Sequence, residues 1–342
     1  MEYDELVAFF QEIGEKKFRA TQVYDWIHNK LADSFDEMTN LSKDLREKLK
    51  KESAICKVEA VKVSESAIDG TKKYLFKLQD GNLIESVFMK YEHGNSVCVS
   101  SQVGCRMGCR FCASTLDGLI RNLLPGEILG QIYEIIKETG ERVSNVVIMG
   151  SGEPLDNYDN VVKFIRLLNA ENGLNISQRN ITLSTCGLAD KIRRLADEGL
   201  QVTLALSLHA PTDEKRRELM PIANKYSLKE VIEACKYYFD KTGRRLTFEY
   251  SLVGGVNDGV GEADELIKLI WGLNCHVNLI PVNPIKERDY IQSTKTVVSA
   301  FKNRLDKHHI TATVRRTMGA DINGACGQLR KAHIEGVNEK TK

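Results

Sequence analysis

Three cysteines stand close together in a glycine-containing segment: Cys105, Cys109 and Cys112, spaced C-x3-C-x2-C. Thiolates this close along a chain can bind different irons of one cubane cluster, while Gly104 and Gly108 relieve the backbone around it. The segment supplies three ligands and a [4Fe-4S] cluster has four irons, so one iron would stay open to activate another molecule. The pattern therefore predicts an iron–sulfur cluster with an open position.

A zinc site is the alternative that this spacing leaves open, with Cys98 or a histidine as the fourth ligand. Zinc modules usually combine two C-x2-C pairs, or one pair with H-x3-H, and the sequence has no second pair. The nine cysteines are unevenly spaced, which argues against a framework of structural disulfides and for metal or redox chemistry. Packing is the expected role of Cys56, Cys235 and Cys275.

The elements that must position these cysteines follow from the pattern of apolar residues. From about Asn95 onward, short β-branched runs alternate with segments of helical period, which implies a parallel sheet with right-handed crossovers. About six strand–helix units are compatible with an incomplete (β/α) barrel and with an open doubly wound sheet. The expected strands are 97–101, 146–150, 181–185, 202–208, 246–252, 276–281 and 310–315.

The segment 1–58 predicts a small helical domain, with residues of helical period after "GEKKFRATQ" and a second helix over 42–50. Residues 59–95 alternate in polarity, and Asp80-Gly81 between two strand-like runs predicts a hairpin turn. The expected divisions are the helical domain 1–58, a hairpin or linker extension 59–95, the main domain 96–335 and a tail 336–342.

Composition places the chain among ordinary globular proteins, with 342 residues, 42% hydrophobic and 28% charged. No apolar run approaches the roughly 18 residues of a membrane helix, and the acidic N-terminus is unlike a signal peptide. We therefore expect a cytoplasmic protein without a membrane partner. The net charge of +1 does not indicate nucleic acid, but the segment 301–342 is basic and could contact phosphates.

With Phe111 before its last cysteine, the cysteine segment resembles the radical S-adenosylmethionine (SAM) superfamily. The resemblance implies that the open iron binds the amino and carboxyl groups of SAM, and that an electron from the cluster cleaves SAM to a 5′-deoxyadenosyl radical. It also implies a partial (β/α)6 TIM-type barrel beside the helical domain. Active-site residues are then expected at the C-terminal ends of the strands.

Several motifs fall at those strand ends. The segment "GSGEPL" is similar to the superfamily motif that receives the SAM amino group. A lone serine there is more often a cap and a lone histidine more often a core residue, but their recurrence at successive strand ends favours a functional role. The resemblance implies SAM binding by Gly152, Glu153, Ser184, Ser207, Leu208, His209 and Asn283.

Two further cysteines carry a closer resemblance. The segments "CVSSQVGCRMGCRFCAST", which contains Cys98, and "DINGACGQLR", which contains Cys326, together resemble the RlmN/Cfr group of RNA adenine methyltransferases over nearly the whole chain. This resemblance implies that Cys326 accepts a methyl group from one SAM and that a second SAM yields the radical that removes a hydrogen from it. The methylene radical then adds to adenine and links enzyme to RNA.

The same resemblance implies that Cys98 resolves this adduct and ends in a disulfide with Cys326. Glu85 matches a proton acceptor, with an exposed strand carboxylate as the alternative. The implied substrates are 23S rRNA and tRNA, the electron donor is a flavodoxin or ferredoxin, and the enzyme is a monomer. Methylation at C2 of adenine is implied by Pro154 after Glu153 and by the flanks "FCAST" and "RRTMGADI"; C8 methylation of the Cfr type is the alternative.

Two rival functions remain compatible with parts of the sequence. One is a zinc-stabilised RNA-binding module without catalysis. The other is a radical SAM enzyme acting on a small molecule or a protein, which leaves the helical domain and Cys326 unexplained. The chain also departs from many relatives at Ser151 and at Cys186, which adds a thiol near the expected SAM site.

Overall fold

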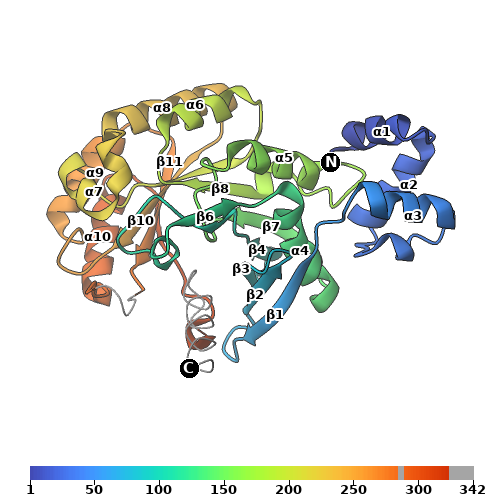
Figure 1. Ribbon diagram of the computed structural model, residues 1–342. Helices are drawn as coiled ribbons and strands as arrows, with labels where there is room; N and C mark the ends of the chain where they lie inside the picture. Colours follow the sequence, from blue (N-terminus) through green and yellow to red (C-terminus); the bar gives the residue numbers. More distant parts are fainter. Residues whose placement is uncertain (284–288, 323–342) are drawn as a thin grey trace.

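The computed structural model describes residues 1–283 and 289–322. Its main sheet has ten strands in the order β1-β2-β3-β4-β7-β8-β9-β10-β11-β12 (Figure 1). From β4 to β12 neighbouring strands pair in parallel and follow one another in chain order. The parallel strands are β4 (Asn95–Cys98), β7 (Val143–Ile148), β8 (Ile181–Thr185), β9 (Thr203–Ser207), β10 (Leu246–Leu252), β11 (Cys275–Pro281) and β12 (Ala312–Val314).

This order decides between the two architectures left open by the sequence. A doubly wound sheet reverses its strand order at a switch point, whereas this order never reverses, as in a barrel. The predicted partial barrel is therefore confirmed, and all the predicted strands are present with slightly shifted ends. The covering helices are α4 (Pro125–Thr139), α5 (Tyr158–Asn169), α6 (Ala189–Asp197), α7 (Asp213–Leu219), α8 (Leu228–Thr242), α9 (Val260–Ile270) and α10 (Lys295–Lys307).

The segment 59–95 extends the barrel sheet. Strands β1 (Val58–Glu65), β2 (Lys72–Leu78) and β3 (Leu83–Met89) pair antiparallel, and β3 pairs with β4. The predicted hairpin turn at 80–81 joins β2 to β3. A separate two-stranded sheet, β5 (Gln102–Gly104) with β6 (Leu119–Asn122), brackets the cysteine segment. Short 3₁₀ helices occupy Phe35–Glu37, Ala113–Thr115, Gln178–Asn180, Pro221–Asn224 and Ala320–Ile322 (η5).

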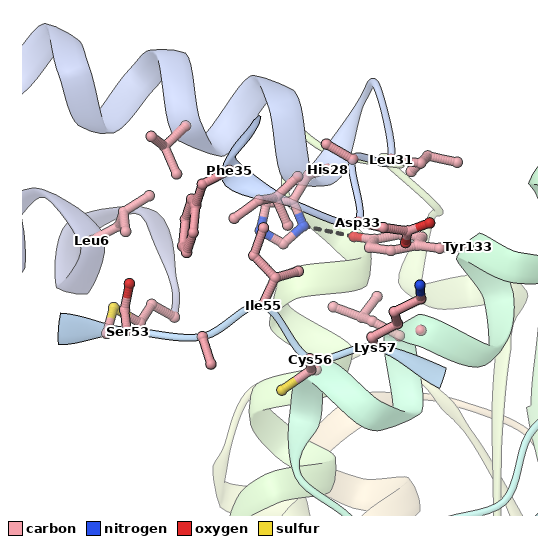
Figure 2. A pocket seen from close by; sticks show the side chains of 18 of the residues that line it. Leu6, His28, Leu31, Asp33, Phe35, Ser53, Ile55, Cys56, Lys57 and Tyr133 are labelled. Carbon is pink, nitrogen blue, oxygen red and sulfur yellow. Dashed lines mark hydrogen bonds between the residues drawn. The ribbon is translucent and has the colours of Figure 1, made fainter. Parts of the chain in front are cut away.

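The N-terminal helices α1 (Tyr3–Glu12), α2 (Lys17–His28) and α3 (Lys43–Glu52) form a lobe with its own core, including Phe10 and Met38 (Figure 1). The lobe packs beside α4, where His28 Nδ1 lies 2.6 Å from Tyr133 Oη and Lys137 Nζ lies 2.6 Å from Asp33 Oδ1. Figure 2 shows the His28–Tyr133 hydrogen bond beside a cavity of about 140 Å³ that apolar side chains of both parts surround. No helix in the described part of the chain could cross a membrane.

Candidate active site

The cysteine segment forms a loop that is closed at its base. The backbone N–H of Cys105 donates to the carbonyl of Gly118 at 2.9 Å. Gly104 adopts φ 75°, and a Cβ there would lie 2.0 Å from the Gly118 carbonyl oxygen, so only glycine fits this approach. Within the loop, Thr115 Oγ1 donates to the carbonyls of Cys109 and Cys112 at 3.1 and 2.9 Å. These contacts hold the three cysteines in a compact turn.

The three thiols line a cavity of about 260 Å³ at the C-terminal ends of the barrel strands. Burial raises the pKa of Cys105 to about 12 and also raises the pKa of Cys109. The cavity brings together almost every residue expected at the SAM site. Those residues are Gly152, Glu153, Ser184, Ser207, His209 and Asn283.

Leu208 is the expected SAM-binding residue that does not line the cavity. Its side chain is fully buried in the hydrophobic core, and its backbone N–H donates to the carbonyl of Glu249 at 3.0 Å. Strand β9 ends at Ser207 and His209 has a positive φ of 57°, so the chain turns directly after the buried Leu208. Ser207 and His209 accordingly face the cavity.

The glycines after β7 allow this loop to run against the backbone that follows β4. A Cβ on Gly150 would lie 2.6 Å from the carbonyl oxygen of Val99, and one on Gly152, at φ 109°, would lie 2.6 Å from Gln102 Cβ. Gln102 Oε1 accepts from the backbone N–H of Glu153 at 2.8 Å. These contacts fix the position of Glu153 in the cavity wall.

The Glu153 carboxylate is anchored by backbone donors. It accepts from the N–H groups of Cys186 at 2.7 Å and Leu155 at 3.1 Å. Burial raises the pKa of Glu153, while these hydrogen bonds oppose that shift. A buried carboxylate at a cavity wall is suited to receive a cationic amino group.

His209 packs against the cysteine loop. It adopts φ 57°, and its Nδ1 accepts from the backbone N–H of Ser251 at 2.9 Å, so the neutral ring carries its proton on Nε2. Burial lowers the pKa of His209 to about 3, and the edge of its ring meets Phe111 with centroids 4.7 Å apart. His209 is therefore a neutral hydrogen-bonding group of the cavity.

Several cavity residues were not anticipated from the sequence. Glu249 lies on β10, where burial raises its pKa and Asn278 donates to its carboxylate at 2.9 Å. A glutamate inside the apolar run "TFEYSL" was a usable signal, because a strand rarely buries a charge without a role. Met149, Ser251 and Arg315 also line the cavity and carry no such local signal, whereas Cys186 lines it as expected for a thiol near the SAM site.

Cys98 and Glu85 lie on one face of the neighbouring strands. Cys98 pairs with Val87 across β4 and β3, is 3% exposed, and packs in a cluster that includes Met149 from the cavity wall. Glu85 is two residues before Val87 and therefore shares its face. Glu85 is 1% exposed and lies 3.1 Å from Lys73, so the alternative of an exposed strand carboxylate is wrong.

Cys326 lies outside the described residues, so its expected pairing with Cys98 stays a prediction. No two of the described cysteines are joined by a disulfide. The segment that leads toward Cys326 is described as far as Ile322. Asp321 accepts from Ser66 Oγ at 2.6 Å and from the backbone N–H of Ala67 at 2.9 Å, which ties η5 to the turn between β1 and β2.

The thiols fit a cluster better than a single ion. Within residues 1–283 and 289–322, no three His, Cys, Asp or Glu side chains are grouped to hold one metal ion. A structural zinc ion needs such a group, whereas a cubane offers a separate iron to each thiolate. The donor set and the adjoining cavity therefore suit a cluster with SAM beside it.

This fold and site define a radical SAM enzyme, and residues 99–270 match the Radical SAM superfamily model. Residues 1–55 match the model for the ribosomal RNA large subunit methyltransferase N-terminal domain. The chain is 65% identical to the probable dual-specificity RNA methyltransferase RlmN of Lachnospira eligens, over 99% of this chain and 97% of that protein. It is 62% identical to the corresponding protein of Lachnoclostridium phytofermentans, over 97% and 93%. The chain thus belongs to the RlmN family.

A crystal structure supports the same identification. The radical SAM methyltransferase from Sphaerobacter thermophilus superimposes with a TM-score of 0.92 at 42% identity, covering 96% of this chain and 97% of that one. The protein is therefore a radical SAM RNA methyltransferase that uses a [4Fe-4S] cluster and two SAM molecules per turnover. Neither the zinc-stabilised binding module nor an enzyme acting on a small molecule or a protein is compatible with this family.

Proposed function

We propose that the enzyme methylates C2 of adenine in 23S rRNA and in tRNA. The observation that carries this proposal is the 65% identity, over nearly the full length of both chains, to a relative named as a dual-specificity RNA methyltransferase. Similar relatives from Clostridium novyi and Clostridioides difficile carry the same name at 58% and 55% identity. The C8 alternative has no such support among these relatives.

The residues of the barrel cavity take the roles that its geometry allows. Cys105, Cys109 and Cys112 would hold the cluster, and Glu153 would receive the SAM amino group, with Gly152, Ser184, Ser207, His209 and Asn283 around the rest of SAM. When bound, the cluster and SAM supply the radical that removes a hydrogen atom from an S-methyl group. The base must leave its RNA stack to reach this cavity.

Cys326 is the proposed methyl carrier and point of attachment to RNA. Two contacts support its access to the site: Asp321 binds the β1–β2 turn, and Gly319 N–H donates to Asp69 at 3.0 Å. Cys326 is four positions beyond Ile322, a length of chain that spans at most about 14 Å. The segment thus starts beside the turn between β1 and β2, in the same sheet whose strands β3 and β4 carry Glu85 and Cys98.

Cys98 is the proposed resolving thiol, and its attack on Cys326 would release the methylated base and leave a disulfide. Glu85 is the proposed acceptor of the proton that the adenine ring loses. Lys73 Nζ lies 3.1 Å from its carboxylate and would hold that carboxylate in place. The side chains of Cys98 and Glu85 face the same side of the sheet from two adjacent strands, β4 and β3.

The partners are proposed from chemistry as well as family. A flavodoxin or ferredoxin supplies the electron, the enzyme acts as a monomer, and it works in the cytoplasm, where its RNA substrates are found. The helical domain and the basic segment 301–342 would hold RNA backbone, since cationic side chains neutralise phosphates.

The regiochemistry is tested by incubating the reconstituted enzyme with unmodified rRNA or tRNA and deuterium-labelled SAM, followed by digestion to nucleosides. We expect labelled 2-methyladenosine from both RNAs. A dominant 8-methyladenosine product would show that the C2 proposal is wrong. If tRNA gives no labelled product, the proposal that the enzyme acts on both RNAs is wrong.

The two-cysteine step is tested separately. Cys98→Ala should still methylate Cys326 but accumulate protein crosslinked to RNA, because the adduct forms before it is resolved. The crosslink should be absent from Cys98→Ala, Cys326→Ala, and present at the wild-type level in the control Cys275→Ala. Equal crosslinking by the double variant would exclude Cys326 as the attachment point.

A further inference from the structure

One buried charge in the described barrel is not explained by the site as assigned. Arg216 of α7 is fully buried and is not ion-paired with any described carboxylate. Its Nη2 donates to the carbonyls of Cys186 at 2.6 Å and Ser207 at 3.4 Å, and its Nε donates to that of Leu208 at 3.2 Å. Nη1 is buried and has no hydrogen-bond partner among the described residues.

The guanidinium lies directly behind the cavity wall. Two of its acceptors belong to the cavity residues Cys186 and Ser207, and a Cβ on Gly187 would lie 3.1 Å from its Nη2. The helix that carries it also contacts the cysteine loop, where the backbone N–H of Arg110 donates to the carbonyl of Leu219, at the end of α7, at 2.9 Å. Asp213 of the same helix acts on Arg216 only at longer range, because its carboxylate accepts from the backbone N–H of Leu228 at 2.7 Å and forms no ion pair among the described residues.

A buried guanidinium without a negative partner is unfavourable, and arginine does not lose its proton in proteins. A compensating charge is therefore expected nearby. An oxidised cluster of charge 2+ held by three thiolates has one net negative charge, and reduction adds a second. The attraction to a nearby cation is thus stronger in the reduced state.

We propose that Arg216 is the buried counter-ion of the cluster and raises its reduction potential, so that the electron needed for SAM cleavage is accepted more readily. The inference rests on the proposed cluster ligands. Arg216 contacts neither SAM nor RNA in this role and acts through its charge on the cluster. It is a positioning residue as well, because it ties together the ends of β8 and β9.

Charge and hydrogen bonding are separated by three variants. Arg216→Met removes both, Arg216→Lys keeps the charge but loses the planar fork, and Arg217→Met removes an exposed charge from the same helix. Each is reconstituted anaerobically without RNA, its iron and sulfide are counted, and the midpoint potential is measured by redox titration with detection of the reduced cluster by electron paramagnetic resonance.

In Arg216→Met the ratio of reduced to oxidised cluster at a fixed potential should fall about tenfold, a shift of about 59 mV to more negative potential. Arg216→Lys should stay within about twofold of the wild type. Arg217→Met should not shift, because solvent and salt screen an exposed charge. A full iron content with an unshifted potential in Arg216→Met would overturn the proposal, as would an equal shift in Arg216→Lys.

If Arg216→Met fails to hold four irons, its potential cannot be compared, and Arg216→Lys then separates a role for the charge from a role for the hydrogen bonds. Iron retention and a near-normal potential in Arg216→Lys support a role for the charge, whereas loss of iron there shows that the hydrogen bonds alone matter. Absence of iron from the wild-type protein would instead contradict the proposed cluster ligands, so the two failures are distinguishable.

Discussion

Two cavities in the described part of the molecule have very different chemistry. The barrel cavity, about 260 Å³, lies where successive parallel strands end, and its lining includes four cysteines, four serines, a histidine and two glutamates. The interdomain cavity, about 140 Å³, lies between the N-terminal lobe and α4 and is lined mostly by apolar side chains such as Leu6, Phe35 and Ile55 (Figure 2). Both occur at places where ligands commonly bind.

The two cavities differ in how their polar side chains are hydrogen-bonded and where these side chains point. In the interdomain cavity, the buried His28 ring is already engaged by Tyr133 and lies against Tyr24, with ring centroids 4.1 Å apart. In the barrel cavity, backbone donors orient Glu153 and His209, and their positions converge on one space from different strands. A cavity therefore becomes a reaction site when its fixed polar groups converge on a space, whereas the interdomain cavity joins two packed surfaces.

The strongest test of this contrast exchanges a thiol in each cavity. Replacing Cys112 by Ala should abolish cluster binding and SAM cleavage, because two remaining thiolates cannot hold the cubane. Replacing Cys56 by Ala in the interdomain cavity should leave both unchanged. Iron and sulfide content and the formation of 5′-deoxyadenosine measure the outcome. Normal iron in Cys112→Ala, or zinc in place of iron in the wild type, would contradict the cluster assignment.

A second test exchanges a glycine in each cavity wall. Gly152→Ala combines a positive φ with a Cβ 2.6 Å from Gln102 Cβ, so it should displace the Glu153 loop and weaken SAM binding about 100-fold or more. Gly126→Ala would place its Cβ 2.7 Å from Cys56 Sγ, and the cost should appear as about 1–3 kcal/mol of stability. Calorimetric SAM binding and thermal unfolding separate the two effects.

Unchanged SAM affinity in Gly152→Ala would mean that the loop tolerates the shift and that Glu153 does not depend on it. Equal loss of affinity in both variants would mean that the glycines act through global stability. Either result would weaken the distinction between the cavities.

The sequence predicted the local part of the site well. Cys105, Cys109 and Cys112 lie within eight residues, and the glycines beside Glu153 also belong to one short segment, so spacing along the chain carries their chemistry. The strand-end serines and His209 followed from the barrel pattern, because parallel strands bring their ends together. Leu208 shows the limit of motif matching, since its side chain packs in the core although both of its neighbours line the cavity.

What the sequence could not show depends on contacts between distant segments. Arg216 looks like any surface arginine of a charged helix, and only the approach of α7 to the ends of β8 and β9 buries it. Arg315 likewise has no local sequence feature that marks it, and it lines the cavity only because the chain after β12 passes there. The docking of the helical lobe through His28 and Tyr133 joins residues 105 positions apart, so no local pattern indicates it.

The smallest effect in this series concerns that docking and its dependence on pH. Burial and the nearby N-terminal amine lower the pKa of His28 to about 4, below its usual value of 6.5. The unfolded chain therefore takes up a proton between about pH 6.5 and 4 while the folded ring stays neutral, so stability is full above pH 6.5 and is lost as pH falls. Between pH 7 and 5 the loss should be about 1–2 kcal/mol.

His28→Gln should remove this part of the pH dependence, because glutamine can hydrogen-bond Tyr133 but does not titrate. Hydrogen exchange over α2 and α4 at pH 7 and 5 measures it locally, since the pKa of His209, also lowered by burial, affects global unfolding in the same direction. Wild-type exchange at the lobe should accelerate at pH 5 relative to the variant. If both proteins respond equally, the histidine does not control docking, and the apolar contacts around the interdomain cavity alone hold the lobe in place.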